Sequence, residues 1–238
     1  MSIYITGDTH GTIDLNKLIN LSYRDETLTK KDYVIIVGDV AILWSSFIPS
    51  RPNKISMRDK DLIDIYNSLP FTTLFIDGNH ENHKALHKFP VSIWNGGKVH
   101  KITNSIIHLM RGQIFNINNY TFFTMGGADS VDKLTRIENE SWWPEEMPND
   151  LEYVEAMKNL NRIHYKVDYV LTHCCQNKYL QQLCTIHPSP DELTDFLSNI
   201  EDDYNLQFTH WYFGHHHKDI QLDEKHTCLY QNIVKIGG

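Results

Sequence analysis

The chain has 238 residues, of which 41% are hydrophobic and 22% are charged. These values are typical of one globular domain with a full hydrophobic core, and they exclude a mini-protein or a disordered chain. The net charge of −8 and the lack of a Lys/Arg-rich stripe argue against a surface for double-stranded DNA. No apolar run approaches roughly 18 residues and no signal region precedes Ile3, so we expect a cytoplasmic protein without a membrane partner.

The first third of the chain predicts alternating strands and helices. Strands are expected at residues 3–6, 33–37 and 73–76, which are rich in β-branched and aromatic residues and end at Gly or Asp-Gly. Between them, apolar residues recur at helical spacing over 15–19 and 62–69. This order predicts a parallel sheet core.

The rest of the chain predicts a second group of strands. Runs at 105–110, 113–117 and 120–125 are joined by short turns and predict an antiparallel meander. After the polar and aromatic segment 126–149, the pattern predicts helices around 154–163 and 193–200 and strands at 169–172, 211–213, 228–230 and 233–236. No repeat or linker divides the chain, so we expect a single domain over residues 1–238, with 126–149 as a cap or substrate loop.

Metal-binding residue types follow five of the predicted strands. They are Asp8 and His10 after the first, Asp39 after the second, Asn79 and His80 after the third, His173 after the fourth, and His215 and His217 after the fifth. The carboxyl ends of parallel strands meet at one edge of a sheet, where loops build sites on a rigid base. Most of these residues have a glycine beside them, which permits a sharp turn and a close backbone approach.

These segments resemble, in order, the motifs of the calcineurin-like metallophosphoesterases. The matching stretches are Gly7-Asp8-Thr9-His10-Gly11, Gly38-Asp39, Gly78-Asn79-His80-Glu81, Thr172-His173 and Gly214-His215-His216-His217. The resemblance implies an α/β fold, the four-layer sandwich in which two mixed β-sheets are flanked by helices. It also implies two divalent metal ions. One is held by Asp8, His10 and His217 and the other by Asn79, His173 and His215, with Asp39 as the bridging ligand.

The donor set and the resemblance together suggest the metal and the proton donor. Imidazoles, carboxylates and an amide oxygen suit Mn²⁺, Fe or Zn²⁺, and the resemblance favours Mn²⁺, with Ni²⁺ as a further alternative. His80 is not a ligand by resemblance and is the natural general acid for the leaving alkoxide. Glu81 is expected behind the ligands, where it steers their geometry. His216 should point away from its two neighbours by strand-like alternation.

The second motif bears on the substrate. Residues 38–44 read Gly-Asp-Val-Ala-Ile-Leu-Trp, whereas protein serine/threonine phosphatases of the superfamily carry Gly-Asp-x-Val-Asp-Arg-Gly. The missing Arg and second Asp favour a phosphodiesterase that acts on a nucleotide or short oligonucleotide, because a diester carries less charge than a monoester. The alternatives are a phosphomonoesterase, including a protein phosphatase-like one, and a non-catalytic metal-binding interaction scaffold with the same fold.

Three further groups of residues leave alternatives open. Arg136 is a candidate to grip phosphate and Trp142 and Trp143 to stack on a base, unless these residues anchor the cap on the core. His83 and His87 are expected on an exposed helix face. The four cysteines, Cys174, Cys175, Cys184 and Cys228, lack paired metal-knuckle spacing and predict reduced thiols. A thiolate at Cys174 or Cys175 could coordinate a metal, but the pattern favours small buried side chains.

Overall fold

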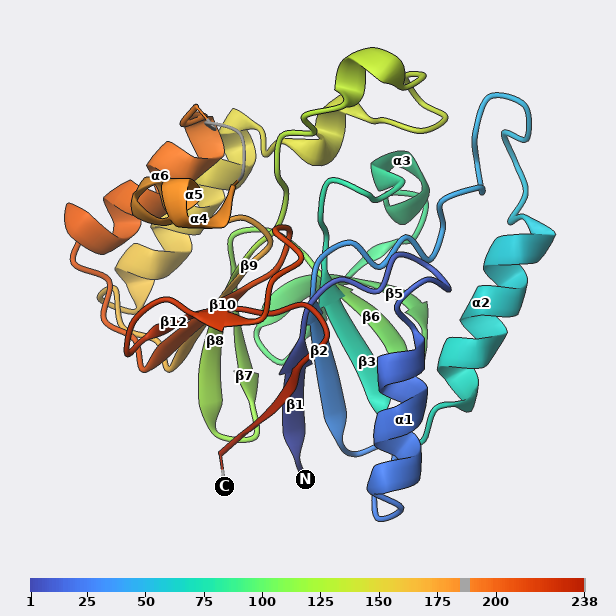
Figure 1. Ribbon diagram of the computed structural model, residues 1–238, viewed down its shortest axis with the longest axis horizontal. Helices are drawn as coiled ribbons and strands as arrows, with labels where there is room; N and C mark the ends of the chain where they lie inside the picture. The colour runs from blue at the N-terminus through green and yellow to red at the C-terminus, as the bar shows by residue number, and fades with distance from the viewer. Residues whose placement is uncertain (185–188, 238) are drawn as a thin grey trace.

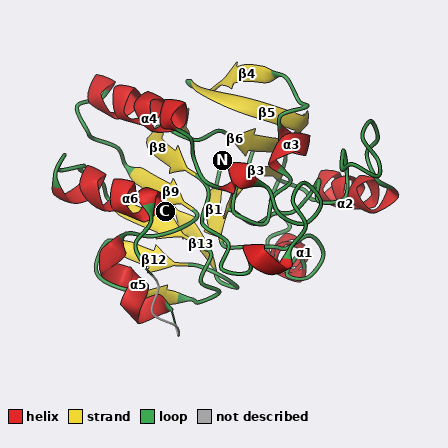
Figure 2. Cartoon of the chain, turned by 90° about the horizontal axis from the view of Figure 1, so that it is seen from above, coloured by secondary structure: helices red, strands yellow, loops and turns green. Residues whose placement is uncertain are grey.

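The computed structural model describes residues 1–184 and 189–237. Two β-sheets face each other, with helices on both outer sides (Figure 1, Figure 2). The first sheet contains β1 (Ile3–Thr6), β2 (Tyr33–Val37), β3 (Thr72–Ile76), β4 (Val91–Trp94), β5 (Gly97–Thr103), β6 (Ile106–Leu109) and β13 (Ile233–Ile236), in the order β13-β1-β2-β3-β6-β5-β4. The second contains β7 (Gln113–Ile117), β8 (Tyr120–Met125), β9 (Tyr169–Thr172), β10 (His210–Phe213), β11 (Ile220–Gln221) and β12 (His226–Cys228), in the order β11-β12-β10-β9-β8-β7.

The helices fall into two groups on opposite sides of the sandwich. The α-helices are α1 (Asn16–Arg24), α2 (Met57–Ser68), α3 (His83–Leu86), α4 (Asp150–Arg162), α5 (Asn177–Leu183) and α6 (Glu192–Asp202), and two short 3₁₀ turns are η1 (Lys133–Thr135) and η2 (Pro144–Glu146). Helices α1 and α2 cover the first sheet, and α4, α5 and α6 cover the second (Figure 1). Within the described ranges, no helix is both long enough and apolar enough to cross a bilayer.

Three apolar layers hold the sandwich together. The middle layer joins the two sheets, with side chains such as Ile5 and Ile35 packed against Phe122 and Leu171. One outer layer buries the apolar stripe of α2 on the first sheet, and the other buries α4, α5 and α6 on the second. The alternating strand faces of β1 and β2 therefore serve both a middle and an outer layer, which explains why these short strands are apolar throughout. The predicted four-layer α/β sandwich is confirmed.

The predicted meander is wrong in its first strand. Residues 113–117 and 120–125 form the expected antiparallel hairpin β7-β8, but β6 belongs to the other sheet. It pairs parallel to β3 and antiparallel to β5. The sequence pattern also missed the β4-β5 hairpin, whose two-residue turn is Asn95-Gly96. Strand-like periodicity identifies β6, but it carries no information on which sheet the strand joins.

Parallel pairing brings five loops to one end of the sandwich. Strands β1, β2 and β3 run parallel in the first sheet, and β8, β9 and β10 run parallel in the second. The segments that follow β1, β2, β3, β9 and β10 therefore meet at the top of Figure 1. The segment 126–149, which contains η1 and η2, rises over the same end.

Candidate metal centre

The turns after these strands adopt unusual backbone conformations. His10, Asp39, His215 and His217 have φ values of 45°, 51°, 65° and 49°, a left-handed region that residues other than glycine rarely occupy. Such strain is retained where the surrounding structure enforces it, commonly at functional sites. Glycines allow the close packing between the turns. A Cβ on Gly38 would overlap the His173 ring, and one on Gly214 would overlap the Asp8 carboxylate.

Asp8, His10 and His217 form the first cluster. Their potential ligand atoms all lie within 4.8 Å of one another. Asp8 is fully buried, and its Oδ2 lies 3.3 Å from Nε2 of His217. His217 is about half exposed, so this cluster borders solvent. Two imidazoles and a carboxylate at this spacing fit a divalent transition metal.

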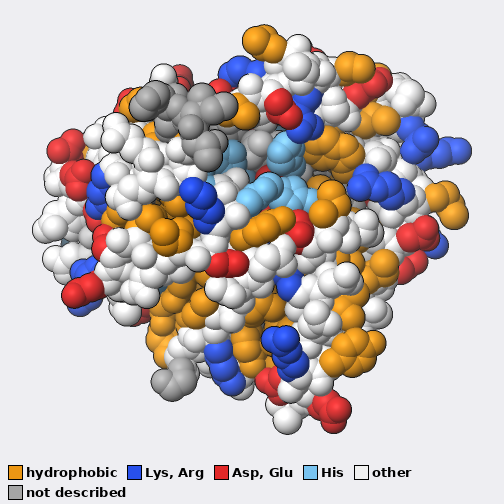
Figure 3. Space-filling view, in the orientation of Figure 1, with side chains coloured by type: hydrophobic (Ala, Val, Ile, Leu, Met, Phe, Trp, Pro, Cys, Tyr) orange, Lys and Arg blue, Asp and Glu red, His pale blue; other side chains and the backbone are white. Residues whose placement is uncertain are grey.

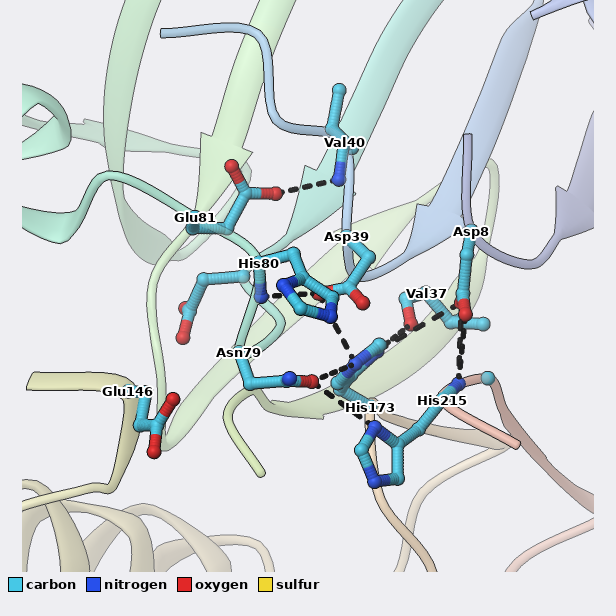
Figure 4. Close-up of polar contacts among 12 residues, drawn as sticks. Asp8, Val37, Asp39, Val40, Asn79, His80, Glu81, Glu146, His173 and His215 are labelled. Carbon is cyan, nitrogen blue, oxygen red and sulfur yellow. Dashed lines mark hydrogen bonds and ion pairs between the residues drawn. The ribbon is translucent and has the colours of Figure 1, made fainter. Parts of the chain in front are cut away.

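The second cluster lies deeper, around the Asn79 amide (Figure 4). Asn79 Oδ1 is 3.1 Å from Nε2 of His173 and 3.0 Å from Nδ1 of His215. Asp39 contacts both clusters, because its Oδ1 is 3.3 Å from Nε2 of His173 and its Oδ2 is 3.4 Å from Nε2 of His10. Its position therefore suits a carboxylate shared by two ions.

Hydrogen bonds behind the rings orient two of these imidazoles. Nδ1 of His173 donates to the Val37 carbonyl at 2.8 Å, and Nδ1 of His10 lies 3.0 Å from Oδ2 of Asp14. Both contacts leave Nε2 directed at the cluster, as metal-binding histidines require. Burial alone would lower the pKa of His173, but Asp39 and Asp8 raise it to about 10. The buried carboxylates thus create a site that favours positive charge.

Lys17 supports this centre from behind, and sequence reasoning missed it. It is the second residue of α1 and its side chain is buried. Its Nζ donates to the carbonyls of Gly7 and Asp8 at 2.9 and 2.6 Å and to that of Tyr230. Burial lowers the pKa of Lys17 to about 8, against the attraction of Asp8. The sequence signal that could have indicated this buried role was a lysine between Leu15 and Leu18, inside the apolar stripe of a predicted helix. Lys17 ties the C-terminal strand region to the turn that carries Asp8.

The two residues after Asn79 are held in different ways. The backbone N–H of His80 donates to Oδ1 of Asp39 at 2.7 Å, and its ring lies 5.9 Å from the His10 ring between centroids. Burial lowers the pKa of His80, although Asp39 opposes this shift. Glu81 is buried and accepts hydrogen bonds from the backbone of Val40 at 2.6 Å and Ala41 at 3.1 Å. This contact fixes the turn after Asp39.

A cavity of about 390 Å³ opens beside the first cluster. His10, His80 and His217 line it on the metal side. The rest of the lining comes from Ile13, Asp14, Ala41, Trp44, Arg58, Arg136 and Tyr230. The Tyr230 ring stacks on the His217 ring, with centroids 4.7 Å apart. The histidine side chains gather in a hollow on this face, next to an apolar patch (Figure 3). Trp44 was not singled out from the sequence, although it ends the apolar strip after Asp39.

Of the predicted substrate residues in the 126–149 segment, only Arg136 lines the cavity. Arg136 lines the cavity but pairs with both Asp132 oxygens, through Nε and Nη2 at 2.7 Å each. Trp143 is 1% exposed and packs edge-on against Trp44, with ring centroids 5.0 Å apart. Trp142 is half-buried and, like Trp143, is not among the residues that line the cavity. This placement matches the cap-anchoring alternative for Trp143.

A buried ion-pair network lies under the third motif. Asp77 precedes Gly78 and pairs with Arg111, whose Nε donates to Oδ2 at 2.7 Å, and with Nε2 of His108 at 3.0 Å. Burial opposes ionisation of Asp77, but Arg111 and His108 hold its pKa well below the usual value. His83 is also buried beside this network, so the expected exposed helix face is wrong at His83 and holds only at His87. The short helix α3 packs against η2 and the core, which hides His83.

Comparison with known proteins places this geometry in a family. The family described as calcineurin-like phosphoesterase matches residues 1–219. No curated protein gives a significant match. Among solved structures, the chain is similar to a putative 5'-nucleotidase from Staphylococcus aureus in complex with α-ketoglutarate, with a TM-score of 0.50, 15% identity and coverage of 98% of this chain and 50% of that chain. The chain thus spans half the length of that protein, and the likeness concerns the fold.

Two other structures are more distant. One is the phosphopantetheinyl hydrolase from Mycobacterium tuberculosis, with a TM-score of 0.37, 15% identity and coverage of 96% of this chain and 89% of that one. The other is a protein serine/threonine phosphatase from Saccharomyces cerevisiae, with a TM-score of 0.38, 14% identity and coverage of 97% and 67%. The family match extends over nearly the whole chain, and the chain belongs to the calcineurin-like phosphoesterase family.

Proposed function

We propose that this protein is a two-metal phosphoester hydrolase that acts on a phosphodiester of a nucleotide or short oligonucleotide. The observation that carries the proposal is the position of Asp39, with one carboxylate oxygen facing each of two clusters of ligand atoms. Members of the family use a dinuclear divalent metal centre, and the clusters offer seven side chains for it.

The residues divide between two ions. Asp8, His10 and His217 would hold the first, Asn79, His173 and His215 the second, and Asp39 both. We propose Mn²⁺ as the ion, with Fe, Zn²⁺ and Ni²⁺ as alternatives that accept the same donors. When bound, such a pair supplies a water activated for attack on phosphorus and neutralises charge on the phosphoryl oxygens. The chain positions the ligands, through the Val37 carbonyl and Lys17.

His80 is the proposed general acid. Its side chain lines the cavity next to the first cluster, and its backbone is fixed by Asp39, so the ring can reach the leaving oxygen of an ester bound there. The protonated imidazole would transfer its proton to the leaving alkoxide.

His80→Ala should lower kcat on the order of 10²-fold for an ester with a poor alkoxide leaving group. A nitrophenol leaves without a proton, so its ester should suffer a much smaller loss. Steady-state kinetics with the two ester types measures this difference. Equal losses for both esters would contradict the assignment, because they would indicate a role in metal or phosphate binding instead.

The cavity supports a diester that carries a flat apolar group. Trp44, Tyr230 and Ile13 offer a wall for a nucleobase. The charge of Arg136 is already matched by Asp132, so Arg58 is the cation at this rim with the more exposed side chain. A phosphodiester with one negative charge needs fewer cations than a monoester. A cavity lined by Arg58 and by an Arg136 already paired with Asp132 therefore suits a diester.

Trp44→Ala should raise KM for a nucleotide diester about tenfold, since stacking of a base on an aromatic ring contributes about 1–3 kcal/mol. Trp44→Phe should retain most of the affinity. Trp142→Ala is the matched control, because Trp142 does not line the cavity. Kinetics with a dinucleotide and with bis-p-nitrophenyl phosphate, beside thermal denaturation of each variant, tests this proposal. A normal KM in folded Trp44→Ala would contradict it, and a preference for monoesters would favour the phosphomonoesterase alternative.

A further inference from the structure

Three cysteines and one histidine converge just outside the centre described above. Cys174 and Cys175 follow His173 in the turn after β9, His216 lies in the turn after β10, and Cys184 ends α5. Their sequence spacing resembles no zinc motif, and none of them was predicted to bind a metal. The fold brings them together because β9 and β10 are adjacent parallel strands whose turns lie side by side.

The distances among these groups are those of a metal site. The ligand atoms of Cys174, Cys175 and His216 all lie within 4.8 Å of one another. Sγ of Cys175 is 3.3 Å from Nε2 of His216. In a tetrahedral zinc site, with Zn–S of about 2.3 Å and Zn–N of about 2.0–2.1 Å, ligand atoms lie roughly 3.5–3.8 Å apart. Small side-chain adjustments would therefore admit an ion.

A second contact orients the imidazole. Sγ of Cys184 lies 3.6 Å from Nδ1 of His216, on the other side of the ring from Cys175. When Nε2 is a ligand, Nδ1 carries the ring hydrogen and donates it to the sulfur of Cys184. Partners of this kind fix the tautomer and the ring orientation of a metal-binding histidine. The backbone is also fixed, because Oγ1 of Thr172 donates to the Cys174 carbonyl at 2.6 Å.

We propose that Cys174, Cys175 and Nε2 of His216 form a separate thiolate site for a soft divalent ion, Zn²⁺ in the first instance. Two thiolates and an imidazole prefer Zn²⁺ to Mn²⁺, whereas the centre nearby, which has only nitrogen and oxygen donors, also accepts harder ions. Both thiols lose their protons when the ion binds. Cys174 and Cys175 are buried and His216 is half-buried, so the ion enters from the His216 side.

The site shares its two turns with the predicted phosphoesterase ligands. Cys174 directly follows His173, and His216 directly follows His215. An ion in the thiolate site would therefore link the two turns that carry these histidines. The proposal does not depend on the hydrolytic function, because the clusters around Asp39 contain no sulfur ligand.

Co²⁺ binding to the reduced full-length chain tests the proposal. A sulfur-to-Co²⁺ charge-transfer band in the near ultraviolet reports thiolate ligands alone, since the other clusters contain only nitrogen and oxygen donors. We expect this band in the wild type and in Asp39→Asn, and its displacement by Zn²⁺. Cys175→Ala should weaken it, and the double variant Cys174→Ala with Cys175→Ala should abolish it. His216→Ala should weaken Zn²⁺ binding at least about tenfold in competition with a chelator.

Cys228→Ala is the matched control, because Cys228 is buried and its Sγ lies 3.5 Å from the Gly214 carbonyl, outside the cluster. It should keep the charge-transfer band. Protection of thiols from alkylation by Zn²⁺ in the wild type gives a second readout that needs no variant. A wild type without the band, or a Cys174→Ala/Cys175→Ala double variant that keeps it, would overturn the proposal.

Discussion

Asp39→Asn is expected to lower phosphoester hydrolysis on the order of 10³-fold or more. Loss of an outer partner of a metal ligand typically costs 10–100-fold, and Asp39 faces both clusters directly. The amide keeps the size of the side chain but removes the buried negative charge and one strong metal-binding oxygen. Measurement of kcat/KM and of metal content after dialysis should therefore show loss of activity together with loss of bound ion.

The matched control is Asp64→Asn on α2. Asp64 is exposed and, among the residues that the structure describes, pairs only with Lys60 on the same helix, at 3.7 Å. This change should leave both activity and metal content near the wild-type values. If Asp39→Asn retained wild-type turnover while remaining folded, the assignment of Asp39 to the shared position would be contradicted.

Arg111→Met is expected to destabilise the fold by about 3–5 kcal/mol, because it leaves the Asp77 carboxylate buried without its charged partner. The Asp77 side chain is 2% exposed, and Arg111 is its nearest cation. Arg111 also donates to the carbonyls of Glu145 and Glu146 at 2.9 and 3.0 Å. The change therefore also removes two hydrogen bonds that hold the 126–149 segment. Urea unfolding measures the loss as a change in the free energy of unfolding.

Two controls sharpen this measurement. Lys98→Ala breaks the ion pair with Glu155, in which the two side chains are 41% and 35% exposed. This change should cost at most about 1 kcal/mol. The double variant Arg111→Met with Asp77→Asn removes the unpaired charge and should recover part of the stability. A loss below about 1 kcal/mol for Arg111→Met alone would show that Asp77 does not depend on this partner.

Much of the architecture could be predicted because the candidate ligands directly follow short apolar strands in the sequence. The strands before Asp8, Asp39, Asn79 and His173 lie at the predicted residues, to within one position. The assignment of β6 to the wrong sheet has a physical cause, since neighbours in sequence need not be neighbours in a sheet. The β4-β5 hairpin was missed because the edge strand β4 exposes its apolar residues Val91 and Ile93 and carries no buried apolar face.

Tertiary features of the site were beyond single-sequence reasoning. The aromatic pair Trp142-Trp143 could face solvent, substrate or core, and only packing against Trp44 places Trp143 inside. His83 lies at a helical position compatible with either face, and the contact of α3 with η2 decides that it is buried. The thiolate cluster joins residues 42 positions apart, Cys174 and His216, through two adjacent strands. No local spacing encodes that contact.

Titration of metal-stripped protein with Mn²⁺, followed by hydrolysis of bis-p-nitrophenyl phosphate and p-nitrophenyl phosphate, tests the two-metal proposal most directly. We predict that turnover is absent in the stripped chain, rises as two ions bind per chain, and favours the diester. The same titration of Asp39→Asn should give neither full binding nor turnover. Full turnover without any metal would contradict the account. Tight binding of two ions without hydrolysis of either ester or of a dinucleotide would do so as well, and would favour the interaction scaffold.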